Sequence, residues 1–365
     1  MEKRNYKRIT SIDALRAITL FGILIVHTSV IFSFINSVNT FEFTHTGQIL
    51  RLLTKELLQY RCNKIFGILF GISFFLILRN PTYAPNKFIW RCFILIGIGL
   101  LNKIFYTVDA LMWYGLWGIF LVLFRKLSCK NIFISFCVFF FLSSLCIDSH
   151  YFQIHSHSSP LSRYFLHTTL KEIIEYPILL AAKDYIIIVS KDPFSCFWQF
   201  LFGFYLAKRG IIDNLSKYAT KNYIIIIFVS YCLCFFIRRT DLCFFINGFM
   251  DNLTWLLGAL SYSLIFLWLY YHFYPKFRFL EAYGKLGLTN YTFQGLGGVI
   301  ISVLIYLPNK WDIEFIYLSS LVFFIIQLLF SNLWLQYFTN GPLEWAWRCL
   351  TNLKYVSPFK THKYA

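Results

Sequence analysis

The first long apolar stretch of the chain contains three residues that could carry out chemistry. Asp13, Arg16 and His27 interrupt a run of mostly aliphatic side chains. Ionisable groups inside a membrane are costly and mark functional sites by default. A histidine can accept a proton from a hydroxyl near neutral pH, and an arginine offers a planar fork to a phosphate or carboxylate. The three residues therefore predict a catalytic site in which Asp13 orients Arg16.

Helical spacing relates Arg16 to His27, eleven positions further along the chain. At about 100° per residue this separation is three turns and about 20°, so both side chains leave one helix face about 16 Å apart along the axis. We expect both to face one interior channel, with Arg16 near the cytoplasmic end and His27 near mid-membrane. The alternative is structural: Arg16 extends to the interface and His27 bonds a neighbouring helix.

Four more polar residues lie in or beside apolar stretches and are candidate substrate-binding residues: Asn102, Asp109, Asn290 and Gln294. Asn290 and Gln294 are four positions apart and share a helix face, from which they could donate hydrogen bonds to a developing oxyanion. Helix capping is the competing role for Asp109. Hydrogen bonding between helices is the competing role for Asn290 and Gln294.

No metal site is predicted, although one part of the chain is rich in histidine: His150, His155, His157 and His167. These residues lack a regular ligand spacing and have no acidic or cysteine partners arranged with them. Most of the ten cysteines fall in apolar stretches, where we expect small apolar side chains that fill space. Cys62 and Cys243 both lie near the predicted outer face and could pair.

The elements that must position these residues are membrane helices. The 365 residues are 58% hydrophobic and only 14% charged, against roughly a quarter charged in soluble domains. Because a helix needs about 20 mostly apolar residues to cross a bilayer, we searched for stretches near that length. The pattern predicts an all-α polytopic membrane protein with ten spans: 13–35, 64–79, 88–106, 109–124, 131–147, 194–208, 223–237, 252–273, 285–306 and 314–336.

The net charge of +17 is explained by topology rather than by nucleic acid. With both termini in the cytoplasm, ten spans place 22 of the 34 basic residues inside, as the positive-inside rule predicts. The first stretch is too long for a removable signal peptide and contains Arg16 and His27. We therefore expect one membrane domain over residues 1–365, in the inner membrane of a bacterium. The stretches 36–62 and 148–193 would lie outside.

Several motifs, in order from end to end, resemble those of the YeiB-like bacterial membrane proteins: IDALR at 12–16, FGIL at 21–24, KIFGILFG at 64–71, GLL at 99–101, FLFG at 200–203, GKLGLTNY at 284–291 and GPLEWAWR at 341–348. That family is grouped with heparan-α-glucosaminide N-acetyltransferase and, more distantly, with the third family of membrane acyltransferases. The spacing of Arg16 and His27 is similar to the signature of the latter. Three positions depart from the pattern of many relatives: Ala17 stands in place of a glycine, His27 in place of an asparagine, and Asn102 in place of a histidine.

The resemblance implies an acyltransferase that moves an acyl group, expected to be acetyl from acetyl-CoA, to a hydroxyl or amine of a glycan or other envelope component. His27 would be the general base, and Arg16 would hold the donor's phosphate or acyl carbonyl. In the heparan enzyme a loop histidine is implicated, and His45 is the candidate here. The alternatives are a transporter or export component for a small solute or lipid, and an inactive scaffold, which the change at Asn102 favours.

Overall fold

The protein is all-helical wherever its structure is described. The computed structural model describes residues 8–39, 44–80, 83–105, 109–146, 194–240, 244–301 and 313–360. The α-helices are α1 (Thr10–Asn39), α2 (His45–Leu53), α3 (Arg61–Leu78), α4 (Pro85–Phe105), α5 (Leu111–Leu121), α6 (Cys129–Cys146), α10 (Phe197–Lys208), α11 (Leu215–Tyr218), α12 (Lys221–Ile237), α13 (Phe244–His272), α14 (Tyr274–Lys285), α15 (Gly287–Ile301), α17 (Ile313–Tyr337) and α18 (Pro342–Asn352). Over these ranges there is no β-strand, only an isolated bridge between Phe338 and Phe359.

Five described helical segments are long and apolar enough to cross a membrane, or six if the bent pair of α11 and α12 is one span. The five are Thr10–Ser29, His45–Leu78, Cys129–Cys146, Ile246–His272 and Glu314–Tyr337. Four other predicted spans correspond to described helices that are not both long enough and apolar enough to cross a membrane. In the described residues α10 has 12 residues and α15 has 15. The 21 residues of α4 include three basic ones, Lys87, Arg91 and Lys103.

The stretch 36–62, which was expected to lie outside the membrane, is largely helical where it is described. It contains α2 and the π-helix η1 (Thr54–Leu58), and helical structure continues over His45–Leu78. Leucines 50, 53, 57 and 58 recur at helical spacing on this segment, and the interspersed charged residues concealed that periodicity. The segment 148–193, with His150, His155, His157 and His167, lies outside the described residues, as does Cys243.

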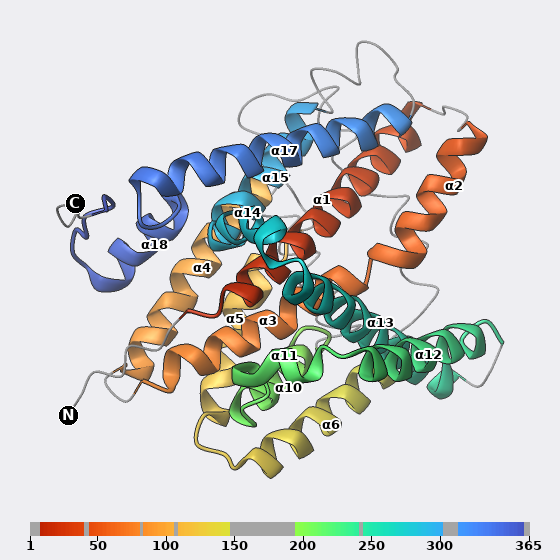
Figure 1. The fold of residues 1–365 in the computed structure, drawn as a ribbon, viewed down its shortest axis with the longest axis horizontal. Helices are drawn as coiled ribbons and strands as arrows, with labels where there is room; N and C mark the ends of the chain where they lie inside the picture. Colours follow the sequence, from red (N-terminus) through yellow and green to blue (C-terminus); the bar gives the residue numbers. More distant parts are fainter. Residues whose placement is uncertain are drawn as a thin grey trace.

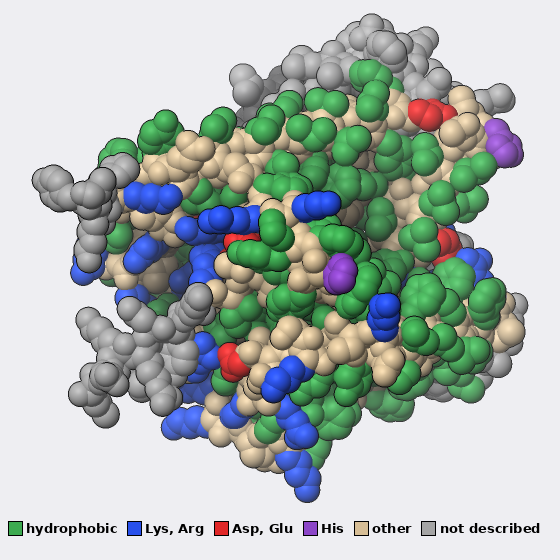
Figure 2. Space-filling model, in the orientation of Figure 1, with side chains coloured by type: hydrophobic (Ala, Val, Ile, Leu, Met, Phe, Trp, Pro, Cys, Tyr) green, Lys and Arg blue, Asp and Glu red, His purple; other side chains and the backbone are tan. Residues whose placement is uncertain are grey.

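Helix α1 runs through the middle of the helices and packs against α3, α13, α14, α15 and α17 (Figure 1). It is antiparallel to α3, because Arg16 meets Ser73 near one end while Gly22 meets Cys62 further along. Both described ends of the chain lie at the same side of the molecule as the start of α1 (Figure 1). Lysine and arginine side chains also gather on that side, whereas most of the remaining visible face is hydrophobic (Figure 2).

Glycines let α3 and α10 cross with their backbones in contact. A Cβ atom on Gly71 would lie 2.1 Å from the Phe200 carbonyl oxygen, and one on Gly203 would lie 2.0 Å from that of Ile68. Small residues allow such close approach between membrane helices, where packing replaces the hydrophobic effect. The glycines of the KIFGILFG and FLFG motifs are therefore explained by one helix crossing, which fixes α3 and the side chains that it carries.

We predict that Gly71→Ala destabilises the protein by about 1–3 kcal/mol, because its methyl group would force the two backbones apart. Gly97 on α4 is the matched control, since a Cβ there would meet no atom within 4 Å. Gly97→Ala should be neutral or stabilising by up to about 1 kcal/mol, through helix propensity alone. Thermal unfolding in detergent compares the two variants. If the two variants were equally stable, the close backbone contact between α3 and α10 would be contradicted.

Candidate functional site

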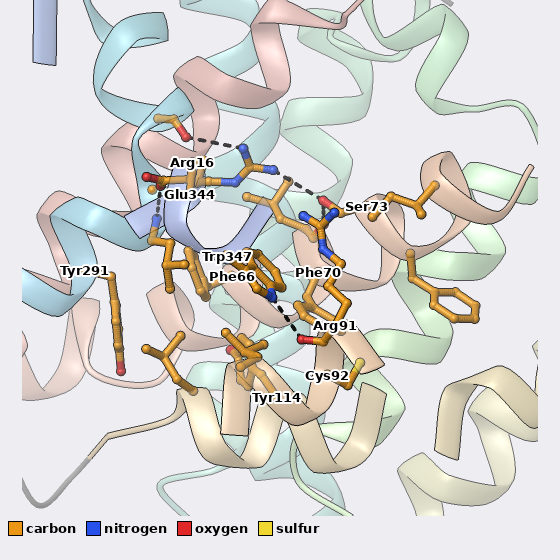
Figure 3. A pocket seen from close by; sticks show the side chains of 18 of the residues that line it. Arg16, Phe66, Phe70, Ser73, Arg91, Cys92, Tyr114, Tyr291, Glu344 and Trp347 are labelled. Atoms are coloured by element: carbon orange, nitrogen blue, oxygen red, sulfur yellow. Dashed lines mark hydrogen bonds between the residues drawn. The ribbon is translucent and has the colours of Figure 1, made fainter. Parts of the chain in front are cut away.

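A cavity of about 210 Å³ lies at the end of α1 where the described chain begins (Figure 3). Seven helices, α1, α3, α4, α5, α14, α15 and α18, contribute to its walls. Its polar and aromatic lining comprises Arg16, Phe66, Phe70, Ser73, Phe74, Phe88, Arg91, Cys92, Tyr114, Lys285, Tyr291, Glu344 and Trp347. The IDALR, KIFGILFG, GKLGLTNY and GPLEWAWR motifs, which are far apart in the sequence, thus meet around one space.

Arg16 is held at the cavity wall by partners on three helices. Its Nη1 donates to Asp13 Oδ1 at 2.8 Å and to the Gly284 carbonyl at 3.3 Å, and its Nη2 donates to Ser73 Oγ at 3.3 Å. Asp13 is buried and also accepts from Arg8. Gly284 is required here because a Cβ would lie 1.8 Å from the Asp13 carbonyl oxygen. The predicted orienting role of Asp13 is therefore matched by its contacts.

Two more cations, Arg91 and Lys285, line the same cavity. The Arg91 guanidinium carbon lies 4.0 Å from the centre of the Trp347 ring, whose Nε1 donates to the Arg91 carbonyl at 2.9 Å. Lys285 lies near the positive charges of Arg8 and Lys360 and near the negative charge of Asp13. Cations therefore outnumber carboxylates around Lys285, and a bound anion would offset their repulsion.

Glu344 is the one carboxylate in the cavity lining, and its oxygens already have partners. Oε1 accepts from the backbone nitrogens of Leu288 at 2.7 Å and Thr289 at 3.1 Å, and Oε2 accepts from the Thr289 hydroxyl. The carboxylate thus caps the first turn of α15, where the helix dipole also favours a negative charge. Burial raises the pKa of Glu344, and the Thr289 and Leu288 hydrogen bonds oppose that rise.

The inner end of the cavity is aromatic. Phe66 stacks between Tyr114 and Tyr291, with ring centres 5.7 and 6.0 Å away. The Tyr291 hydroxyl accepts from the Ala110 backbone nitrogen at 3.1 Å, and the Tyr114 hydroxyl donates to the Asn63 carbonyl at 3.4 Å. Both phenol groups are thereby tied to the backbone. The cavity combines basic walls with an apolar floor, the lining expected for an anionic ligand with an apolar part.

His27 lies beyond this floor and does not line the cavity. Its ring meets Tyr291 edge-on, with ring centres 5.7 Å apart, and only 7% of the residue is exposed. Because Gly22 meets Cys62 and the two helices are antiparallel, His27, five positions beyond Gly22, lies toward the Arg61 end of α3 and away from Ser73. Arg16 and His27 belong to one helix, as predicted, but Tyr291, which contacts the histidine and lines the cavity, separates His27 from the cavity that Arg16 lines.

Asn102 and Asp109 form a pair that joins α4 to the start of α5. Asn102 donates to Asp109 Oδ1 at 2.9 Å, and Asp109 Oδ2 accepts from the Leu111 nitrogen at 2.9 Å. Both residues are buried and neither lines the cavity. The capping role that competed with substrate binding for Asp109 agrees with these bonds.

Asn290 and Gln294 are buried in a hydrogen-bond network between helices. Asn290 donates to the Tyr283 carbonyl and to Ser331 Oγ, both at 3.0 Å. Gln294 donates to the Leu20 carbonyl at 3.2 Å and to the Tyr283 hydroxyl at 2.9 Å. Their amide nitrogens therefore connect α15 to α1, α14 and α17 instead of pointing at the cavity, which matches the alternative role weighed for them.

The structure adds Arg91, Lys285, Glu344 and Trp347 to the candidate site, none of which was singled out from the sequence. Three of them belong to the motifs GKLGLTNY and GPLEWAWR, so charged and aromatic residues inside those motifs were the available signal. Arg91 lies in none of these motifs, and in the sequence it resembles the many other basic residues near the ends of helices. Among the described residues, no group of three or more His, Cys, Asp or Glu could hold a metal ion.

Comparisons with known proteins find relatives whose printed names assign no activity. Residues 206–354 match the family described as "Protein of unknown function (DUF418)". The chain is 25% identical to "Uncharacterized 39.9 kDa protein in amylase 3'region" of Bacillus acidopullulyticus, covering 94% of each chain. It is 22% identical to "Uncharacterized protein YxaH" of Bacillus subtilis, covering 96% of this chain and 95% of the relative. It is 39% identical to "Uncharacterized protein YeiB" of Escherichia coli over 93 residues, 23% of each chain. No solved structure matches.

We predict that Glu344→Ala destabilises the protein by about 1–3 kcal/mol, because the donors of Leu288 and Thr289 lose their buried acceptor. Asp213→Ala is the control, since Asp213 is 55% exposed and forms a 3.7 Å ion pair with Arg79. Such a surface pair is worth at most about 1 kcal/mol. Thermal unfolding of both variants measures the difference in their stability. A Glu344→Ala protein as stable as the control variant would refute the capping role.

Proposed function

We propose that this chain, which belongs to the YeiB-like membrane proteins as its motifs predicted, is an acyltransferase of the bacterial inner membrane. The acyl group would be acetyl, carried by acetyl-CoA. The acceptor would be a hydroxyl or amine of a glycan or another envelope component. The proposed topology keeps ten spans with both termini in the cytoplasm.

The cavity at Arg16 is the observation that carries the proposal. Arg16, Arg91 and Lys285 are cations on its walls, while the charge of Glu344 is engaged by the first turn of α15. Acetyl-CoA combines several phosphate charges with a neutral chain that ends in a small acyl group. Its phosphates suit the basic walls, and its acyl end suits the aromatic floor. About 210 Å³ accommodates only the acyl end and the atoms nearest to it.

The distribution of charge supports the proposed orientation. Arg8, Lys285 and Lys360 are close enough to affect one another electrostatically, at the end of the molecule that carries the cavity. Most of the lysines and arginines visible in Figure 2 lie on that same side. The positive-inside rule assigns such an end to the cytoplasm, where acetyl-CoA is available as the donor.

His27 remains the proposed general base, with the acceptor approaching from the far side of Tyr291. In the transfer step the acceptor oxygen attacks the thioester carbonyl, and neutral His27 accepts the proton which that oxygen loses. The bond between the carbonyl carbon and sulfur breaks, and the leaving thiolate takes the proton that His27 accepted, which returns His27 to its neutral form. The Tyr291 ring would have to turn aside for this step, because it separates His27 from the cavity. The proposal gives no role in transfer to Asn290 or Gln294, whose amide nitrogens bond other helices.

The first test is donor binding. We predict that the purified protein binds acetyl-CoA saturably and that Arg16→Gln weakens this binding by roughly tenfold to a hundredfold, the effect of losing hydrogen bonds to a charged group. Lys217→Gln, a change at an exposed lysine on α11, should bind as the unmodified protein does. Isothermal titration calorimetry measures both. If acetyl-CoA does not bind and a solute is moved instead, the protein is a transporter.

The second test separates binding from transfer. We predict that His27→Ala retains acetyl-CoA binding, because His27 does not line the cavity. The same variant should lose general-base catalysis, lowering acetyl transfer by roughly 10²–10⁴-fold. Transfer from radiolabelled acetyl-CoA to membrane glycans is the readout. Full transfer by a folded His27→Ala protein would exclude the histidine as the base.

A further inference from the structure

A second cationic site lies at the start of α3, at the opposite end of that helix from Ser73. Arg61 and Lys64 are three positions apart on its first turn, and they are 0% and 6% exposed. No described helix end elsewhere buries a guanidinium so completely. A buried charge is retained only where a counter-charge or another strong partner compensates for the lost hydration.

The described surroundings of Arg61 supply only weak partners, among them the Tyr231 ring, whose centre lies 5.8 Å from the guanidinium carbon. Its Nη2 lies 3.4 Å from the Tyr231 hydroxyl, and its Nε and Nη1 have no hydrogen-bond partner among the described residues. Asp251, the buried carboxylate nearby, forms its ion pair with Arg238. Glu56 pairs with Arg238 at 3.9 Å and with Arg239 at 3.3 Å. No described carboxylate is within ion-pair distance of Arg61.

Aromatic residues complete the site and add further donors. The Lys64 ammonium lies 5.2 Å from the ring centre of Trp198 and 5.0 Å from that of Trp255. The indole N–H groups of both tryptophans are buried and have no acceptor among the described residues, and the same holds for the Thr254 hydroxyl. The helices α3, α10 and α13 thus bring cations and unused hydrogen-bond donors to one region.

The backbone of α13 is shaped around the arginine. A Cβ on Gly258 would lie 3.0 Å from Arg61 Cγ and 3.0 Å from the Tyr231 ring. The arginine therefore has a fitted position between α12 and α13, although a neutral side chain there would avoid the cost of burying a charge. A buried polar group without a partner calls for a ligand, an ion or water that provides one.

We infer that Arg61 and Lys64 form a binding site for a phosphate group, either free or in a lipid headgroup. Arg61 Nε or Nη1, each without a hydrogen-bond partner among the described residues, would donate to a phosphate oxygen, and the Lys64 ammonium would add a second charge. This binding is independent of acyl transfer. If the proposed function holds, the site, which lies toward the same end of α3 as His27, would hold an anionic group of the acceptor, and that extension rests on the proposed function.

The test uses the full-length protein with Arg16→Gln, so that the cavity at the other end of α3 does not contribute. Thermal unfolding is measured in neutral detergent with inorganic phosphate against sodium chloride of equal ionic strength. A parallel set uses nanodiscs of phosphatidylcholine with and without phosphatidylglycerol. Each condition is repeated with Arg61→Gln added, and with Lys217→Gln added as the control for a lost exposed cation.

We expect the anion to raise the unfolding temperature of the Arg16→Gln protein. Adding Arg61→Gln should weaken the apparent affinity for the anion roughly tenfold to a hundredfold, whereas adding Lys217→Gln should leave that affinity unchanged. Without anion, Arg61→Gln should be at least as stable as its parent, because an uncompensated buried charge is removed. A response to inorganic phosphate identifies a free anion, and a response to phosphatidylglycerol alone identifies a headgroup. Either supports the site.

Two outcomes would overturn the inference. One is the absence of any stabilisation by phosphate or phosphatidylglycerol. The other is an Arg61→Gln protein that is less stable without anion yet responds to it fully, which would make Arg61 an internal structural cation. Because acetyl-CoA binding is measured separately and depends on Arg16, failure of this site and failure of the proposed function give different results.

Discussion

The fixed position of Arg16 is the constraint on which the rest of the candidate site depends. An arginine within a largely apolar protein must have partners, and this one obtains them from three helices: Asp13 on α1, Ser73 on α3 and the Gly284 carbonyl on α14. Gly284 can approach only because it lacks a side chain. One guanidinium thereby sets the spacing of α1, α3 and α14, and the cavity opens beside it.

The remaining walls follow from how α15 and α18 are joined. Glu344 on α18 satisfies the first backbone N–H groups of α15, so two segments about 55 residues apart in sequence have a fixed relative position. Trp347, one turn further along α18, lies over Arg91 of α4. Arg16 and Glu344 are thus held by hydrogen bonds, and Arg91 by its contact with the Trp347 ring, before any ligand arrives. Such preorganisation lowers the cost of binding an anion.

The two ends of α3 have contrasting electrostatics. At the Ser73 end, Arg16 is matched by Asp13, and a cavity is present. At the other end, Arg61 is fully buried while the neighbouring carboxylates pair with Arg238 and Arg239. His27 of α1 lies toward the Arg61 end, and Tyr291 lies between it and the cavity.

The sequence by itself determined that the chain is all-helical, rich in apolar segments and basic at one side, because hydropathy and helical spacing are local properties. It also identified the motifs IDALR, GKLGLTNY and GPLEWAWR through their resemblance to the YeiB-like proteins. It predicted ten spans, and five described helical segments, or six with the bent pair of α11 and α12, are long and apolar enough to cross a membrane. Apolar composition alone does not show where α10 begins or that 45–58 is helical. Only the tertiary structure decided which polar residues meet. Whether Gln294 bonds Tyr283, whether Tyr291 separates His27 from Arg16, and whether Arg61 has a carboxylate partner depend on contacts between segments far apart in the chain, and no local pattern encodes those contacts.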